Sequence, residues 1–274
     1  MNPERIRSTA LAAALTVKAR IRLVSGRDFW TTEPVGDVVP AIALADGPHG
    51  LRKQRGDNDH AGLAAAEPAT CFPTASGLAS TWDPELLEAV GAALGSEARA
   101  LGVSVVLGPG LNLKRHPCGG RNFEYFSEDP LLSGTMAAAM VRGIQSRGVS
   151  ACPKHFAVNN QETRRMIIDA VVDQRTLREL YLRGFERVVR TAAPGALMTA
   201  YNQVNGTFAS DSAFLLSEVL RGDWGFDGMV VSDWSGTNDR VAGLRAGLDL
   251  EMPGGAGTFD REVAAAIADG SLDE

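Results

Sequence analysis

The chain has 274 residues, of which 45% are hydrophobic and 22% are charged, as in ordinary soluble globular proteins. Its net charge of −6 argues against a nucleic acid or an anionic membrane as a partner, because both attract basic surfaces. The length favours a single domain, since a (β/α)8 barrel takes about 250 residues.

The N-terminal segment lacks the uninterrupted apolar core of a signal peptide. Basic residues interrupt its apolar positions between Leu11 and Leu23, a pattern that predicts a helix ending at Gly26. No stretch approaches the roughly 18 uncharged apolar residues of a membrane span. We therefore expect a cytoplasmic protein.

Three cysteines, Cys71, Cys118 and Cys152, lie far apart and form no CxxC pair. This number and spacing indicate neither a zinc site nor a disulfide framework. They are expected to be small apolar side chains in a reducing compartment.

Short apolar runs that end abruptly in polar residues recur along the chain, and helical patterns lie between them. The runs are 41–45 before Asp46, 103–107 before Gly108, 149–152 before Lys154, 196–199 before Tyr201, 229–232 before Asp233, and Leu248 with Leu250 before Glu251; the helical patterns are 83–99, 131–147, 173–190 and 211–221. This alternation predicts an α/β fold with a parallel sheet. The number of polar strand ends favours a closed barrel over a doubly wound sheet, because in a barrel all of them can meet at one pocket.

Two carboxylates follow predicted strands directly. Asp46 opens a turn of glycine and proline, where a carboxylate can accept two sugar hydroxyls or can simply stabilise the turn. Asp233 follows a buried strand and precedes Trp234, whose ring offers an apolar wall for a sugar face. Asp233 is therefore a candidate nucleophile, and a helix cap is the alternative interpretation.

Lys154 and His155 end a strand that is expected to be buried. A buried lysine is costly unless it is paired or functional, so a structural ion pair and a Schiff-base lysine are both open. The polar run 159–164 that follows suits hydroxyl recognition. Arg121, with Asn122 and Glu124, follows a glycine turn, and its guanidinium suits vicinal diols or an internal pair with the glutamate.

Together these segments resemble glycoside hydrolase family 3. The matching stretches are Asp46-Gly47-Pro48, Phe72-Pro73-Thr74, the run from Gly108 to Pro130 that contains GGRNFEYFSEDP, Lys154-His155-Phe156, Ala200-Tyr201-Asn202 and Val231-Ser232-Asp233-Trp234. The resemblance extends from about residue 20 to residue 255, and it implies an N-terminal (β/α)8 TIM-like barrel that spans residues 1–274 and is incomplete at its C-terminal end.

The resemblance also implies roles for individual residues. Asp233 matches the catalytic nucleophile of the family. The residues that match sugar-binding or other pocket positions are Asp46, Arg52, Arg121, Lys154, His155, Arg164, Met198, Tyr201 and Trp234. No metal or organic cofactor is implied, and the implied partner is a β-glucoside or an oligosaccharide.

Two departures narrow the subclass. The family's bacterial β-N-acetylglucosaminidases carry an acid/base histidine in a loop after KHF, and Ala157 to Glu162 contains no histidine. The resemblance therefore points to the two-domain β-glucosidases, whose acid/base is a glutamate on a following α/β sandwich domain that this chain lacks. The family's xylosidases usually carry a glutamate at the first motif, where this chain has Asp46-Gly47. The resemblance therefore favours a hexoside as the substrate.

The end of the chain has the S-x-x-E form of a capping box, from Ser271 to Glu274, which starts a helix. We therefore expect the natural domain to continue. The overall expectation is a retaining exo-β-glycosidase barrel, and the alternative is a fragment that binds sugar with little or no turnover. A Schiff-base aldolase built on Lys154 is the competing enzyme class.

Overall fold

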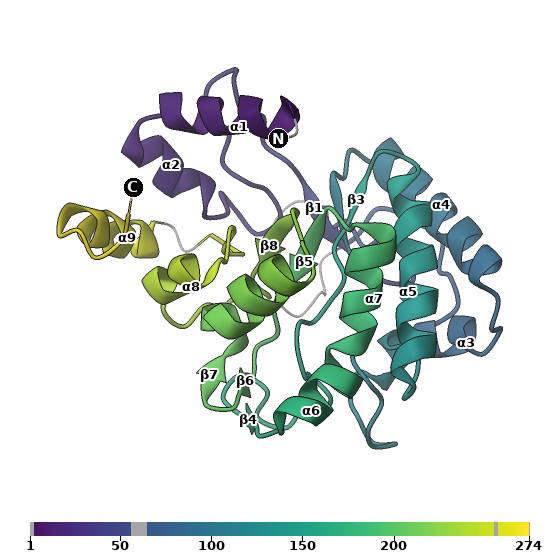
Figure 1. Cartoon of the computed structure of the whole chain (residues 1–274). Coiled ribbons are helices and arrows are strands. Elements are labelled where there is room, and N and C mark those ends of the chain that lie inside the picture. Colours follow the sequence, from purple (N-terminus) through teal and green to yellow (C-terminus); the bar gives the residue numbers. More distant parts are fainter. Residues whose placement is uncertain (1–2, 56–64, 255–256, 274) are drawn as a thin grey trace.

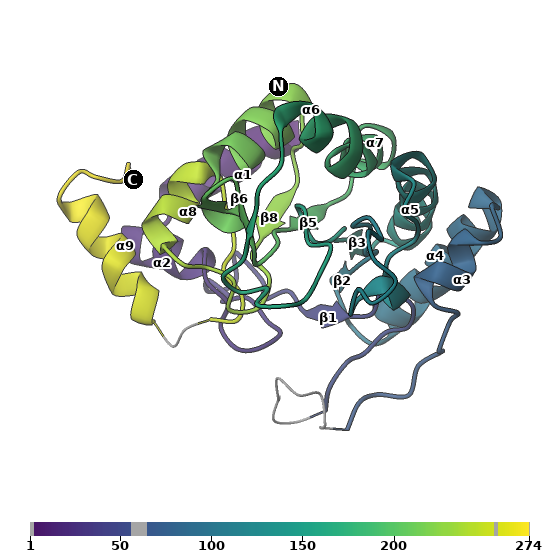
Figure 2. The same cartoon turned by 90° about the horizontal axis from the view of Figure 1, so that it is seen from below.

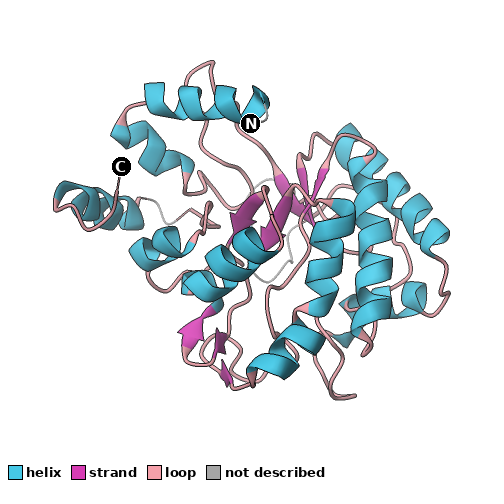
Figure 3. Cartoon of the chain, in the orientation of Figure 1, coloured by secondary structure: helices cyan, strands magenta, loops and turns pink. Residues whose placement is uncertain are grey.

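The computed structural model describes residues 3–55, 65–254 and 257–273. Short strands lie at the centre and helices surround them on several sides (Figures 1, 2 and 3). The strands are β1 (Leu44–Asp46), β2 (Val105–Leu107), β3 (Ser150–Ala151), β4 (Asp169–Ala170), β5 (Ala196–Met198), β6 (Gln203–Val204), β7 (Thr207–Phe208) and β8 (Met229–Val231). The predicted α/β fold is confirmed.

The helices follow the predicted alternation, with differences in detail. The α-helices are α1 (Pro3–Ala14), α2 (Val17–Leu23), α3 (Ala75–Ala79), α4 (Pro84–Ala100), α5 (Pro130–Gln145), α6 (Gln174–Thr176), α7 (Arg183–Ala192), α8 (Arg240–Ala246) and α9 (Thr258–Ala268), with 3₁₀ turns η1 (Asn122–Glu124) and η3 (Ala209–Asp211) and π-helical segments η2 (Leu177–Tyr181) and η4 (Phe214–Asp223). Thr16 divides the predicted N-terminal helix, because its hydroxyl accepts a hydrogen bond from the amide of Ala19 and so caps α2.

Asp83 fixes the start of α4, as the sequence predicts. Its carboxylate accepts a hydrogen bond of 2.9 Å from the amide of Leu86, and Pro84 occupies the first helical turn. Asp129 and Pro130 repeat this arrangement at α5. The predicted helices at 173–190 and 211–221 contain the π-helical segments, which a 3.6-residue pattern does not distinguish from an α-helix.

The central strands pair in parallel in chain order. β1, β2 and β3 form one sheet, and β5 pairs with β8. Single parallel bridges join Phe156 to Thr199 and Val231 to Leu250. The carboxyl ends of these strands therefore meet at one edge, which is where chemistry is found in parallel α/β folds.

The N-terminal segment connects the last parallel segment to the first. Ser25 bridges Glu251 in parallel, whereas Thr31 bridges Ala43, just before β1, in antiparallel orientation. A second small sheet of β4, β6 and β7 lies apart from the central strands (Figure 1). The named strands that pair in parallel at the centre are β1, β2, β3, β5 and β8. They are fewer than the strands of a complete (β/α)8 barrel, which therefore stays a prediction.

Two other expectations fall partly outside the described residues. The predicted surface loop at 50–69 is described only at its ends, where Gln54 bridges Ala66. The capping box ends at Glu274, which is also outside. Ser271 lies in a turn after α9, where its amide donates to the carboxylate of Asp269.

Helices α4 and α5 pack unusually closely because glycines line their contact. A Cβ atom added at Gly143 would lie 2.1 Å from the carbonyl oxygen of Glu88, and one added at Gly91 would lie 2.4 Å from that of Met140. Leu87, Leu94 and other fully buried apolar side chains complete this part of the core.

Gly143→Ala should therefore destabilise the fold. Forcing an extra carbon into a close-packed contact typically costs about 1–3 kcal/mol, so the free energy of unfolding in urea should fall by that amount. Gly77→Ala is the matched control, because a Cβ atom there would lie 3.7 Å from its nearest neighbour. Equal stability of the two variants would show that the close approach of α4 and α5 is not a constraint.

Candidate active site

A cavity of about 420 Å³ opens at the carboxyl ends of the central strands. This volume lies within the range of about 300–1,000 Å³ that is usual for ligand pockets. Its lining comprises Phe29, Trp30, Asp46, Arg52, Gln54, Leu107, Arg121, Lys154, His155, Arg165, Met166, Met198, Tyr201, Asp233, Trp234 and Ser235. All the residues predicted at the site except Arg164 are among them.

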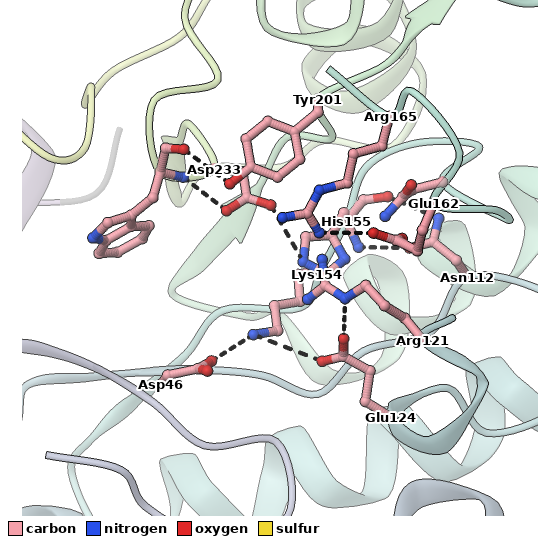
Figure 4. A network of polar contacts seen from close by, with 12 residues as sticks. Asp46, Asn112, Arg121, Glu124, Lys154, His155, Glu162, Arg165, Tyr201 and Asp233 are labelled. Carbon is pink, nitrogen blue, oxygen red and sulfur yellow. Dashed lines mark hydrogen bonds and ion pairs between the residues drawn. The ribbon is translucent and has the colours of Figure 1, made fainter. Parts of the chain in front are cut away.

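Lys154 forms the centre of a cluster of charges on one side of the cavity. Its side chain is only 4% exposed, and its Nζ lies 2.6 Å from Oδ1 of Asp46 and 3.9 Å from Oε2 of Glu124. Arg121 pairs with the other oxygen of Glu124. Figure 4 shows the two cations and two carboxylates arranged in alternation.

The pKa values in this cluster follow from its pairing. Burial alone would lower the pKa of Lys154, but the negative charges of Asp46 and Glu124 outweigh burial and raise it. Burial alone would raise the pKa of Asp46, but Lys154 and Arg121 outweigh it and lower the value. Both partners are therefore ionised at neutral pH.

Asp233 lies across the cavity, directly after β8. Its Oδ1 accepts a hydrogen bond of 2.7 Å from the amide of Trp234, whereas its Oδ2 accepts none from the described residues and lies 3.5 Å from Nε2 of His155. Burial raises the pKa of Asp233, and the charges of Arg121 and Lys154 offset only part of that rise. A hydrogen bond from the side chain of Tyr201 also lowers the pKa of Asp233, but burial has the larger effect.

Tyr201 and three aromatic rings border Asp233. The Tyr201 hydroxyl donates to the carbonyl oxygen of Trp234 at 2.8 Å. The Trp234 ring lies 5.2 Å from that of Trp30, and its Nε1 donates to the carbonyl oxygen of Phe29. Sequence reasoning missed Phe29 and Trp30, because their contact with Trp234 joins positions 205 residues apart in the chain. The adjacent pair of aromatic residues was the available signal.

The polar run after His155 contributes a different arginine from the predicted one. Arg164 is exposed, has a left-handed φ of 54°, and does not line the cavity. Arg165 does line it: its guanidinium lies 4.7 Å above the ring of Tyr201 and pairs with Glu162 at 2.7 Å. The turn at Arg164 directs that side chain outward, and two adjacent arginines give no sequence signal that distinguishes them.

Two further glutamates follow predicted strands but lie outside the cavity lining. Glu162 is held by Arg165. Glu251 lies 3.4 Å from the buried Arg240, and burial raises the pKa of its carboxyl to about 7 although Arg240 opposes the rise. The carboxylates that line the cavity, among the described residues, are therefore Asp46 and Asp233.

The described residues contain no group of three or more His, Cys, Asp or Glu side chains placed to hold a metal ion. Cys71 and Cys118 are exposed thiols, and Cys152 is a buried one. None of the helices in the described part of the chain has the length and hydropathy needed to cross a membrane.

Comparison with known proteins identifies the family of this chain. The sequence profile of the glycosyl hydrolase family 3 N terminal domain matches residues 56–274. The chain belongs to this family. It is 55% identical over 261 residues to thermostable beta-glucosidase B of Acetivibrio thermocellus, covering 95% of this chain and 35% of that protein. It is 47% identical to an exo-alpha-(1->6)-L-arabinopyranosidase of Bifidobacterium longum, covering 94% and 34%.

Solved structures give the same result. Beta-glucosidase 3B of Thermotoga neapolitana in complex with glucose superposes with a TM-score of 0.91 at 44% identity, covering 97% of this chain and 40% of that one. A beta-glucosidase of Bifidobacterium adolescentis gives a TM-score of 0.87 at 44% identity, covering 96% of this chain and 37% of that one. The chain thus spans about a third of the length of the curated relatives that it matches.

Lys154 should form no covalent intermediate. Its raised pKa keeps the amine protonated, and a protonated amine is not a nucleophile. Treatment with borohydride in the presence of a carbonyl substrate should therefore leave the peptide that contains Lys154 at its native mass. A reduced adduct on that peptide would restore the Schiff-base interpretation.

Proposed function

We propose that this chain is the nucleophile-bearing domain of a retaining exo-β-glycosidase that acts on terminal β-D-glucosyl residues. The observation that carries the proposal is Asp233: a buried carboxylate at a strand end, with one oxygen free and facing a cavity that holds Lys154 and Arg121. The glucosidases among the relatives support the choice of sugar. A (β/α)8 barrel is the proposed scaffold.

In the proposed reaction, the free oxygen of Asp233 attacks the anomeric carbon. The bond from this carbon to Oδ2 forms as the glycosidic bond breaks, giving a covalent glycosyl-enzyme, and water then hydrolyses that ester. Asp233 must be ionised to attack. Arg121 and Lys154 favour the anion against burial, which is the chemical reason to have two cations beside this carboxylate.

The opposite side of the cavity is suited to bind hydroxyls. Asp46 is ionised and 38% exposed, so its remaining lone pairs can accept from a diol. Arg121 and His155 extend this polar wall, and Trp234 with Trp30 offers an apolar surface to a sugar ring. Polar groups on one side and indoles on the other are the combination that a pyranoside requires.

The leaving oxygen needs a proton, and the described cavity offers no suitable donor. Asp46 is held ionised by Lys154, and Glu162 and Glu251 lie outside the lining. We propose that a glutamate from a following α/β sandwich domain is the acid/base. The length of the relatives, about three times that of the matched region, supports this. The alternative is a chain that binds sugar but has little turnover.

Asp46 should contribute strongly to substrate recognition. A hydrogen bond from a sugar hydroxyl to a charged group contributes about 1.5–3 kcal/mol, so Asp46→Ala should lower kcat/KM on an aryl β-glucoside at least about tenfold in the enzyme with its complete active site. An unchanged kcat/KM would remove Asp46 from the site. Glu88→Ala is the control, because Glu88 lies on α4 and pairs with Arg142 at the surface.

Asp233 should be labelled by an activated 2-deoxy-2-fluoroglucoside. A dinitrophenolate or fluoride leaves with little protonation, so the covalent intermediate should accumulate slowly even without an acid catalyst. Cellobiose should react far more slowly, since general acid catalysis typically contributes about 10²–10⁴-fold. Peptide mapping identifies the labelled residue, and Asp233→Ala is the unlabelled control.

A label on Glu162 or Glu251 would refute the nucleophile assignment. Brisk turnover of cellobiose by this chain alone would show that an acid/base lies within it. Glucose binding without any label would favour the sugar-binding alternative.

A further inference from the structure

His155 is buried between the hydroxyl of Tyr125 and the carboxylate of Asp233. Its Nδ1 lies 2.9 Å from the hydroxyl of Tyr125, and its Nε2 lies 3.5 Å from Oδ2 of Asp233. The side chain is only 1% exposed. The position of its single proton therefore decides what the ring presents to the nucleophile.

The ring is neutral. Burial lowers the pKa of His155 well below its usual value, and the positive charges of Arg121, Lys154 and Arg165 lower it further. A neutral imidazole carries one N–H and one lone pair. If the lone pair were on Nε2, it would face a carboxylate oxygen, which is repulsive, so Nε2 carries the proton and Nδ1 must accept.

Tyr125 is the group that can donate to Nδ1. Its hydroxyl is buried and accepts a hydrogen bond of 3.1 Å from Nδ2 of Asn159, so its own proton points to the histidine. The hydrogen bonds then run from Asn159 to Tyr125 and from Tyr125 to His155, and the N–H on Nε2 of His155 faces Oδ2 of Asp233 at 3.5 Å without a regular hydrogen bond. Figure 4 marks the contact between His155 and Asp233.

The backbone of His155 is fixed independently. The side-chain amide of Asn112 accepts from the His155 amide and donates to the His155 carbonyl, both at 2.8 Å. These two hydrogen bonds hold the backbone from which the ring projects.

We propose that Tyr125, oriented by Asn159, fixes His155 as the neutral tautomer that carries its proton on Nε2. Tyr125 is thus a positioning residue that touches neither the cavity nor a substrate. The consequence for catalysis rests on the proposed glycosidase function: an uncharged donor is held beside the reacting oxygen of Asp233. The tautomer itself does not depend on that function.

The tautomer can be read directly from nitrogen chemical shifts in a chain labelled with ¹⁵N-histidine. The sequence contains four histidines, and the signal of His155 is the one that His155→Gln removes. Since ionised Asp233 also attracts a proton to Nε2, the decisive measurements are made in an Asp233→Ala background. This background has no nucleophile, so the result is independent of whether the chain is a glycosidase.

In Asp233→Ala, His155 should keep its proton on Nε2. Adding Tyr125→Phe should lower the ratio of the Nε2–H to the Nδ1–H form by about tenfold, which is the effect of losing one buried hydrogen bond. Adding Tyr181→Phe instead is the control, because Tyr181 is a tyrosine that does not contact His155, and it should leave the ratio unchanged. A ratio that Tyr125→Phe does not alter, or a Nδ1–H form in Asp233→Ala alone, would overturn the proposal.

Asn159→Asp gives a second test if the phenylalanine variant does not fold. The new carboxylate accepts the Tyr125 proton, so the tyrosine oxygen can then only accept from the histidine. In the Asp233→Ala background, the Nδ1–H form should become the major one. Persistence of the Nε2–H form would show that Asn159 and Tyr125 do not set the tautomer.

Discussion

The organisation of the cavity depends on keeping one buried cation, Lys154, charged. An unpaired ammonium in this position would be too costly, so the fold must supply carboxylates within reach. Asp46 and Glu124 do so at 2.6 Å and 3.9 Å. Asp46 ends β1, which pairs in parallel with β2 and through it with β3, and Glu124 precedes Tyr125, which bridges Gly110 as Lys154 does. The charge of Lys154 therefore depends on the strand pairing that brings Asp46 to it.

This constraint gives the two cavity aspartates opposite properties. Desolvation alone would raise both pKa values, although the side chain of Asp46 remains 38% exposed. Asp46 is in contact with Lys154, and its pKa is lowered; Asp233 senses the same cations without a direct contact, and its pKa is raised. The anion of Asp46 is thus more strongly stabilised than that of Asp233, because Asp46 contacts Lys154 directly.

The parts of the site that sequence predicted are those with local signals. Asp46 and Asp233 each follow an apolar run directly, and parallel pairing then brings strand ends together without further information. Asp83 and Asp129 likewise mark helix starts through interactions within three residues. Lys154 could be recognised as paired or functional, but its partner Asp46 lies 108 positions away and could not be chosen from spacing.

The contributions that sequence did not predict arise where chain segments meet outside that regular pattern. Phe29 and Trp30 reach the cavity through antiparallel bridges at the N-terminus, and the choice of Arg165 over Arg164 depends on one left-handed residue in a turn. The tautomer proposed for His155 also has no sequence signature, because it depends on which of the two ring nitrogens faces the hydroxyl of Tyr125.

The same cavity leaves polar atoms without partners, which is costly for stability. Oδ2 of Asp233 and Nε2 of His155 are buried and accept or donate no regular hydrogen bond to the described residues. Elsewhere the fold is closely packed, as at the glycine contacts of α4 and α5. The close-packed scaffold holds these two atoms 3.5 Å apart. Moving them would displace β8 or break the hydrogen bond of Asn112 to the His155 backbone.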